Sequence, residues 1–76
     1  MEIVVLYSVK RYDDGCGWTT VSDLFMDSKK AIISAYKEVR EFMGEEEYQA
    51  LLKVGKTAKL NGMQYMVFAS YAHLDL

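Results

Sequence analysis

The sequence predicts an α+β fold: a four-stranded antiparallel sheet, in the order β-β-α-α-β-β, with two helices packed on one face. Alternating and β-branched apolar residues near both ends of the chain predict strands. Apolar residues spaced by three and four between residues 32 and 52 predict helices. The Asn61-Gly62 pair between apolar residues is the strongest short-range signal for a β-hairpin. Together these observations favour two hairpins that flank a pair of helices.

The length and composition of the chain indicate one α+β domain covering residues 1–76. With 51% hydrophobic residues the chain can form a core, but a chain this short buries only about 60 to 65% of its unfolded surface. Its single cysteine, Cys16, excludes an internal disulfide bond. Stability therefore has to come from packing or from a partner chain, and a homodimer stays open at this point.

The N-terminal segment shows no targeting signal. Glu2 stands where a signal peptide would be basic. The apolar run from Ile3 ends at Tyr7, far short of the ~20 residues that cross a bilayer. The unpaired Cys16 fits a reducing compartment. We therefore expect a cytoplasmic protein without membrane contact.

The first two predicted strands form a hairpin with a glycine-rich tip. Ile3–Arg11 has apolar residues on both faces, which is typical of a strand covered on both sides. Residues 12–17 combine two glycines with two aspartates, a density that predicts a loop. Trp18–Phe25 continues with Trp, Thr and Val, which suit a pleated surface.

Two helices are expected between the hairpins. Asp27 or Ser28 can cap the first helix at its start, and Gly44 is expected to end it in the left-handed conformation. Its predicted buried stripe consists of Ile32, Ala35, Tyr36, Val39, Phe42 and Met43. The acidic run Glu45-Glu46-Glu47 suits the positive end of a second helix dipole. The stripe of that second helix consists of Tyr48, Leu51 and Leu52.

The last hairpin has a predicted register. A two-residue type I′ turn at Asn61-Gly62 sets three pairs opposite one another, namely Leu60 and Met63, Lys59 and Gln64, and Ala58 and Tyr65. We expect the short first strand, Thr57–Leu60, to lie at an edge of the sheet.

The residues do not form a catalytic or metal-binding pattern. The only histidine, His73, lies near the chain end, where no second residue is expected to hold it for acid–base work. No serine stands in a G-x-S-x-G nucleophile elbow. The Asp13–Trp18 loop lacks the alternating acids of a calcium loop and the further soft ligands that zinc needs. We therefore predict no enzyme, no catalytic residue, no cofactor and no metal site.

Single-stranded nucleic-acid binding through sheet aromatics is the alternative function. The aromatic residues that could line such a sheet are Tyr7, Tyr12, Tyr65, Phe68 and Tyr71. However, the chain has nine basic and eleven acidic residues, and a net charge of −2 gives little attraction to phosphate. We therefore expect nucleic acid only as part of a partner complex.

Protein binding is the function that the composition favours. Six tyrosines, one tryptophan and five methionines belong to the residue types enriched in interface cores. The predicted partner-binding residues are Tyr12, Asp13, Asp14, Trp18, Glu45, Glu46, Glu47, Tyr65 and Phe68. We expect a stoichiometric inhibitor or adaptor of another macromolecular complex. Anti-defence inhibitors encoded by phages or mobile elements, including anti-CRISPR proteins, are of this size and type, and that origin implies a host cytoplasm, although no motif carries it.

Overall fold

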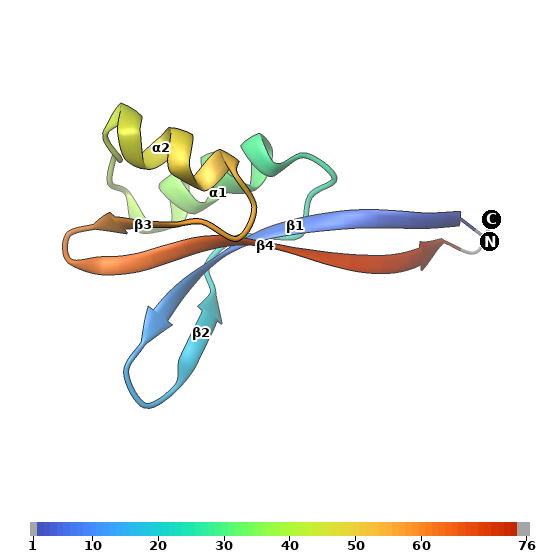
Figure 1. Ribbon diagram of the computed structural model, residues 1–76, viewed down its shortest axis with the longest axis horizontal. Helices are drawn as coiled ribbons and strands as arrows, with labels where there is room; N and C mark the ends of the chain where they lie inside the picture. The colour runs from blue at the N-terminus through green and yellow to red at the C-terminus, as the bar shows by residue number, and fades with distance from the viewer. Residues whose placement is uncertain (1, 75–76) are drawn as a thin grey trace.

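The computed structural model describes residues 2–74 and confirms the predicted order of strands and helices (Figure 1). The elements are β1 (Glu2–Asp13), β2 (Gly17–Thr20), α1 (Ser28–Val39), α2 (Glu45–Leu52), β3 (Thr57–Leu60) and β4 (Met63–Leu74). The four strands form one antiparallel sheet in the order β2-β1-β4-β3. The two predicted hairpins are therefore joined by the long strands β1 and β4, and β3 lies at an edge as expected.

The long strands β1 and β4 form the central pair of the sheet, which we call the β1–β4 ribbon. Its register runs from Glu2 opposite Leu74 to Arg11 opposite Tyr65. Side chains alternate between the two faces along a strand, and opposite residues of an antiparallel pair share a face. Odd-numbered residues of both strands therefore lie on one face, and even-numbered residues lie on the other.

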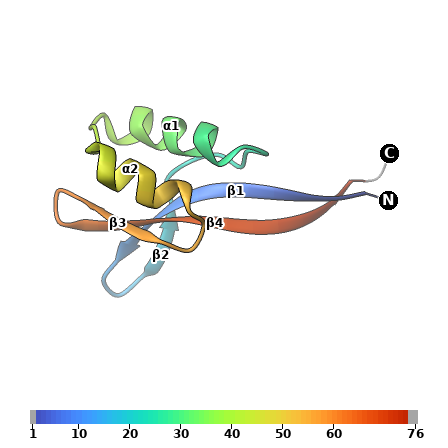
Figure 2. The ribbon, with the colours of Figure 1, turned by 45° about the horizontal axis from the view of Figure 1, so that its top comes forward.

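Both helices cover the face of the odd-numbered residues, and the second view shows them side by side on that face (Figure 2). Asp27 caps α1, because its Oδ1 accepts a hydrogen bond of 2.9 Å from the Lys29 N–H. The buried core consists of Val9, Ala31, Ile32, Ala35, Leu51, Ala58, Leu60, Tyr65 and Val67. Burying a large apolar side chain contributes about 1.5 to 3 kcal/mol, so this layer supplies much of the stability of the fold.

The other face of the sheet has no helix on it. The expectation that the first strand is covered on both sides is wrong, since both helices lie on the odd-numbered face (Figures 1 and 2). Val4 and Leu6, on the even-numbered face, are only half-buried. In the sheet, Val4 lies opposite Ala72 and Leu6 lies opposite Ser70.

The first helix ends earlier than its apolar stripe suggests. Arg40 takes the left-handed conformation with φ 55°, and its N–H donates to the Tyr36 carbonyl at 2.7 Å. This bond closes the last turn, so Phe42 and Met43 lie beyond the helix. Gly44, which the sequence marks as the left-handed cap, has φ −68° and directly precedes α2. Both expectations at this helix end are therefore wrong.

The second strand is also shorter than predicted. It ends at Thr20, and the chain then follows the edge of β1 with irregular bonding. The buried Ser22 accepts the Val9 N–H through its Oγ at 2.8 Å, and Phe25 exchanges two backbone bonds with Tyr7. A side chain thus replaces one main-chain partner and ends the regular ladder.

The hairpin at Asn61-Gly62 has the predicted geometry. Both residues have positive φ, 51° and 78°, as a type I′ turn requires. The three predicted pairs of opposite residues are all present. The Asn61 side chain also donates a hydrogen bond to Glu41, so the turn is attached to the segment between the helices.

Candidate protein-binding surface

The uncovered face of the sheet carries a group of large side chains. We call this face the open face, and its aromatic cluster consists of Lys10, Tyr12, Trp18, Met66 and Phe68. Tyr12 lies opposite Trp18, and Lys10 lies opposite Met66. Three different strands therefore bring the cluster together, which only long-range pairing can do.

The rings of the aromatic cluster pack edge to face. The Trp18 ring centroid lies 5.4 Å from that of Tyr12 and 5.5 Å from that of Phe68, with interplanar angles of 68° and 65°. The Lys10 Nζ lies 4.7 Å from the centre of the Phe68 ring. Each such ring pair contributes about 0.5 to 1.5 kcal/mol. The cluster therefore holds the short strand β2 on the sheet as well as forming a surface.

Charge on the open face differs from that of the whole chain. Among the side chains that the described strands direct to this face, the charged ones are Glu2, Lys10 and Lys59. Glu2 lies at the far end of β1, so the strand residues around Trp18 contribute two lysines and no acid, and Asp14 borders them from the β1–β2 turn. Apolar rings bordered by lysines fit a partner patch with apolar and acidic side chains.

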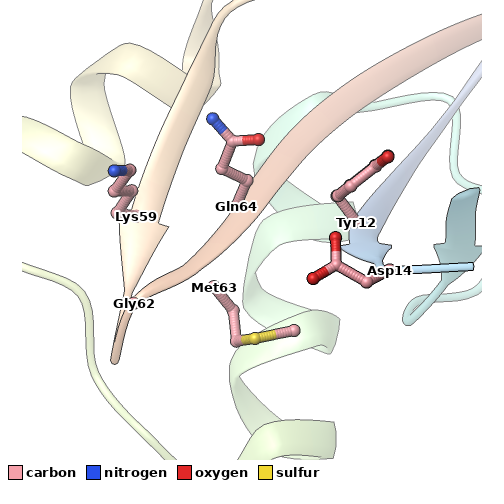
Figure 3. Close-up of a pocket in the computed structure, with 6 residues that line it drawn as sticks. All are labelled: Tyr12, Asp14, Lys59, Gly62, Met63 and Gln64. Carbon is pink, nitrogen blue, oxygen red and sulfur yellow. The ribbon is translucent and has the colours of Figure 1, made fainter.

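A hollow of about 280 Å³ adjoins the aromatic cluster (Figure 3). Tyr12 and Asp14 line it from the end of β1, and Lys59 and Gln64 line it from the β3–β4 hairpin. Its volume lies just below the ~300 Å³ at which small-molecule pockets usually begin. It is large enough to receive a side chain of a partner.

The two aspartates at the β1–β2 tip differ in their contacts. Asp13 is paired with Arg11, whose Nε lies 3.0 Å from Asp13 Oδ1. Hydrogen bonds from Arg11 and then Thr19 hold the pKa of the Asp13 carboxyl below its usual value. Asp14 and Cys16 are exposed. Within residues 2–74, no group of acidic, histidine or cysteine side chains is arranged to hold a metal ion.

The acidic run does not share a surface with Trp18. Glu45, Glu46 and Glu47 form the first turn of α2, in the helical layer on the opposite side of the sheet. Glu45 accepts a 2.9 Å hydrogen bond from Gln49, and a methyl group added at Gly44 would lie 2.5 Å from Glu47 Oε2. These acids complement the helix dipole. The predicted contact residues are therefore divided between the two sides of the sheet.

Tyr65 is a core residue rather than a surface residue. Its side chain is 4% exposed and lies on the helix-covered face, opposite Ala58 and Arg11. Its place among the predicted contact residues is corrected accordingly. Tyr7 and Tyr71 share that face, so the five aromatic residues expected to line one surface are divided between two.

Sequence reasoning missed one exposed aromatic residue. Phe42, predicted to be buried, is 89% exposed in the segment between the helices. It borders a hollow of about 310 Å³ lined also by Tyr36, Lys37, Arg40 and Glu41. Burial, followed by the nearby Tyr48, raises the pKa of Tyr36 to about 12. Only the early end of α1 exposes Phe42, and no residue in the sequence marks that end.

Comparisons with protein-family models, with curated proteins and with solved structures find no match for this chain. In the part of the chain that the structure describes, neither helix has the length and apolar character needed to cross a membrane.

Proposed function

We propose that the chain is a non-enzymatic protein-binding module that acts as a stoichiometric inhibitor or adaptor through its open face. The observation that carries the proposal is the aromatic cluster on a sheet face that no described element covers. Tyr and Trp at the centre of a contact supply large area at low entropic cost. Trp18 is the central anchor, since both neighbouring rings contact it.

The sheet favours a preformed site over one that folds on binding. The strands hold the rings at set spacings, and the edge-to-face contacts limit their rotation. Binding of a partner would therefore cost little further conformational entropy, because folding already orders these side chains. Lys10 and Lys59 beside the rings favour a partner patch that combines apolar residues with carboxylates.

Single-stranded nucleic acid remains the second candidate because those two lysines lie near three aromatic rings. Base stacking, however, needs a free ring face. The ammonium of Lys10 lies over the Phe68 ring, and Trp18 packs edge to face with both of its neighbours. Two lysines also neutralise few phosphates. Protein binding is therefore the better-supported function.

A phage or mobile-element origin, with an anti-defence role of the anti-CRISPR kind in a host cytoplasm, belongs to the proposal as its most specific form. Its support is the small size and the composition of the chain. Identification of the captured partner tests it, because a nuclease complex of a host defence system is the expected target.

The test is capture of partners by the purified chain, followed by titration of the purified partner. Calorimetry measures the affinity of each variant, because Trp18 is the only tryptophan of the chain and Trp18→Ala has no tryptophan fluorescence to follow. Trp18→Ala should weaken binding at least tenfold, which corresponds to about 1.4 kcal/mol. Phe42→Ala is the matched control, because it removes an exposed ring from the other side of the sheet. The control should bind like the unmodified chain.

Three results would contradict the proposal. Loss of binding in the Phe42→Ala variant alone would place the contact at the segment between the helices. Capture of nucleic acid with an affinity that falls steeply with salt would favour the second candidate. Covalent conversion of a captured partner would identify an enzyme. Circular dichroism of each variant separates lost contacts from loss of β2.

A further inference from the structure

The β1–β4 ribbon extends beyond the rest of the molecule as an arm. We define the arm as Glu2–Leu6 of β1 with Ser70–Leu74 of β4. Pairing of β1 with β2 begins at Lys10, the bridge to Phe25 is at Tyr7, and β3 reaches only Met66 of β4. The arm therefore consists of two strands, and both views show that it extends beyond the helices (Figures 1 and 2).

The β4 side of this arm is an open edge. The N–H and carbonyl of Tyr7 form hydrogen bonds with Phe25, so they point away from β4. Main-chain hydrogen bonds between β1 and β4 therefore come from the even-numbered residues of both strands. On the far side of β4, the Val67 carbonyl accepts the Gly55 N–H at 3.2 Å. Ala69, Tyr71 and His73 continue this alternation. Their outward N–H and carbonyl groups have no backbone partner among residues 2–74.

Within residues 2–74, no segment pairs with this edge after Val67. Proteins protect exposed edges with short strands, charged residues or proline. The other outer strands follow that rule, since β2 and β3 each have four residues and β3 carries Lys59. In contrast, residues 68–74 contain no proline and no Asp, Glu, Lys or Arg. Tyr71 is 77% exposed there, and Ile3 on β1 is 62% exposed.

We infer that a second copy of this chain pairs with the β4 edge in an antiparallel arrangement, around a two-fold axis at Tyr71. Ala69 then lies opposite His73 of the second copy, and the two Tyr71 residues lie opposite each other. Three pairs of outward residues form two main-chain hydrogen bonds each. The two sheets become one continuous sheet.

The edge favours a second copy because it is complementary to itself. Among the described residues, the free stretch after Val67 is residues 68–74, which is centred on Tyr71, so one symmetric register uses every outward group of this stretch. In that register Ser70 lies opposite Ala72, both small, and no two like charges meet. On the helix-side face, Val5 and Tyr71 of one copy continue into Tyr71 and Val5 of the other. The β1 edge has only Ile3 and Val5 free before Phe25 blocks it.

The size of the contact sets its strength. Seven residues at about 3.4 Å each give a contact roughly 24 Å long and one strand deep. The area that a contact of this length and depth buries is smaller than the ~800 Å² per partner of a standard interface. The dimer is therefore reversible, and its population depends on the concentration of the chain. It leaves the open face uncovered, so the inference does not depend on the proposed function.

Sedimentation or light scattering of the full chain over a concentration series tests the inference. Tyr71→Pro removes an outward N–H without breaking a bond to β1 and should weaken association at least tenfold. Val5→Pro is the matched control, because it makes the same change directly across the ribbon on the β1 edge. It should leave association unchanged. A monomer at every concentration up to about 1 mM, or equal effects of both variants, would overturn the inference.

Crosslinking tests the register even if the proline variants fail to fold. In a Cys16→Ser background, chains carrying Ser70→Cys are mixed with chains carrying Ala72→Cys and oxidised. The two positions form a non-hydrogen-bonded pair about 4.5 Å apart between Cα atoms, which suits a disulfide bond. A covalent dimer should form in the mixture and in neither variant alone. Absence of a crosslink in the mixture would overturn the inference. A crosslinked dimer of Val4→Cys chains would also overturn it, because Val4 lies on β1 and the two copies would then pair through the β1 edge.

Discussion

The two halves of the β1–β4 ribbon both carry apolar residues at odd-numbered positions, but their surroundings differ. In the covered half, Val9 and Val67 are fully buried beneath the helices. In the arm, Ile3 and Tyr71 occupy the same face of the same strands and are 62% and 77% exposed. Alternation of apolar residues therefore determines which face a side chain occupies. It does not determine what covers that face.

Two isoleucines should differ most in how much they contribute to the free energy of unfolding. Ile32→Ala removes a side chain with no exposure from the core and should lower the free energy of unfolding by about 2 to 5 kcal/mol. Ile3→Ala in the arm should lower it by less than about 0.5 kcal/mol. Urea unfolding of both variants, at a concentration that keeps the chain monomeric, measures the difference. Equal losses would show that the arm is covered in the monomer.

Two serines give the next comparison. Ser22→Ala leaves the Val9 N–H without its 2.8 Å bond in a buried position, which should cost about 1 to 3 kcal/mol. Ser70→Ala removes only a long contact of 3.5 Å to the Leu6 carbonyl in the exposed arm. Its effect should stay within about 0.5 kcal/mol. A harmless Ser22→Ala would mean that the irregular edge after β2 contributes little to the covered half.

The turn at the end of the covered half should show a smaller effect. Gly62 has φ 78°, and a side chain there is strained, so Gly62→Ala should cost about 1 kcal/mol. Gly44→Ala is the control at φ −68°, where the added methyl group displaces only the flexible Glu47 carboxylate. Thermal unfolding should rank Gly62→Ala as the less stable variant. The reverse order would contradict the type I′ turn as a stability determinant.

A further difference between variants is expected only at alkaline pH. Burial raises the pKa of Tyr36 to about 12, so the folded state holds this proton more tightly than the unfolded chain, where tyrosine titrates near 10. The contribution is fully present below about pH 10 and is lost as pH rises towards 12. Tyr36→Phe should therefore lose less stability over this interval. Parallel pH profiles of the two proteins would contradict the assignment.

Local features of the sequence predicted much of the fold. The register of the last hairpin follows from Asn61-Gly62 because a two-residue turn leaves no freedom in pairing. The start of α1 follows from Asp27, whose side chain caps it. Both depend on neighbouring residues, which the sequence shows directly.

Features that depend on distant residues were harder to predict. The end of α1 at Arg40 involves no glycine, so Phe42 seemed to continue the buried stripe. Tyr65 and Phe68 are close in sequence but lie on opposite faces, which follows from alternation once the pairing of β4 is known. The approach of Trp18 to Phe68 requires three strands in the right order, and the separation of Glu45–Glu47 from Trp18 requires the sheet between them.

Site-specific photo-crosslinking shows which face of the sheet a protein partner contacts. A photoreactive residue replaces Thr20, which lies on the open face opposite Lys10, or Lys37, which is exposed on α1. With extract of the source cells, we predict a protein adduct from position 20 and none from position 37. Adducts from position 37 alone, or only nucleic acid at position 20, would contradict the account.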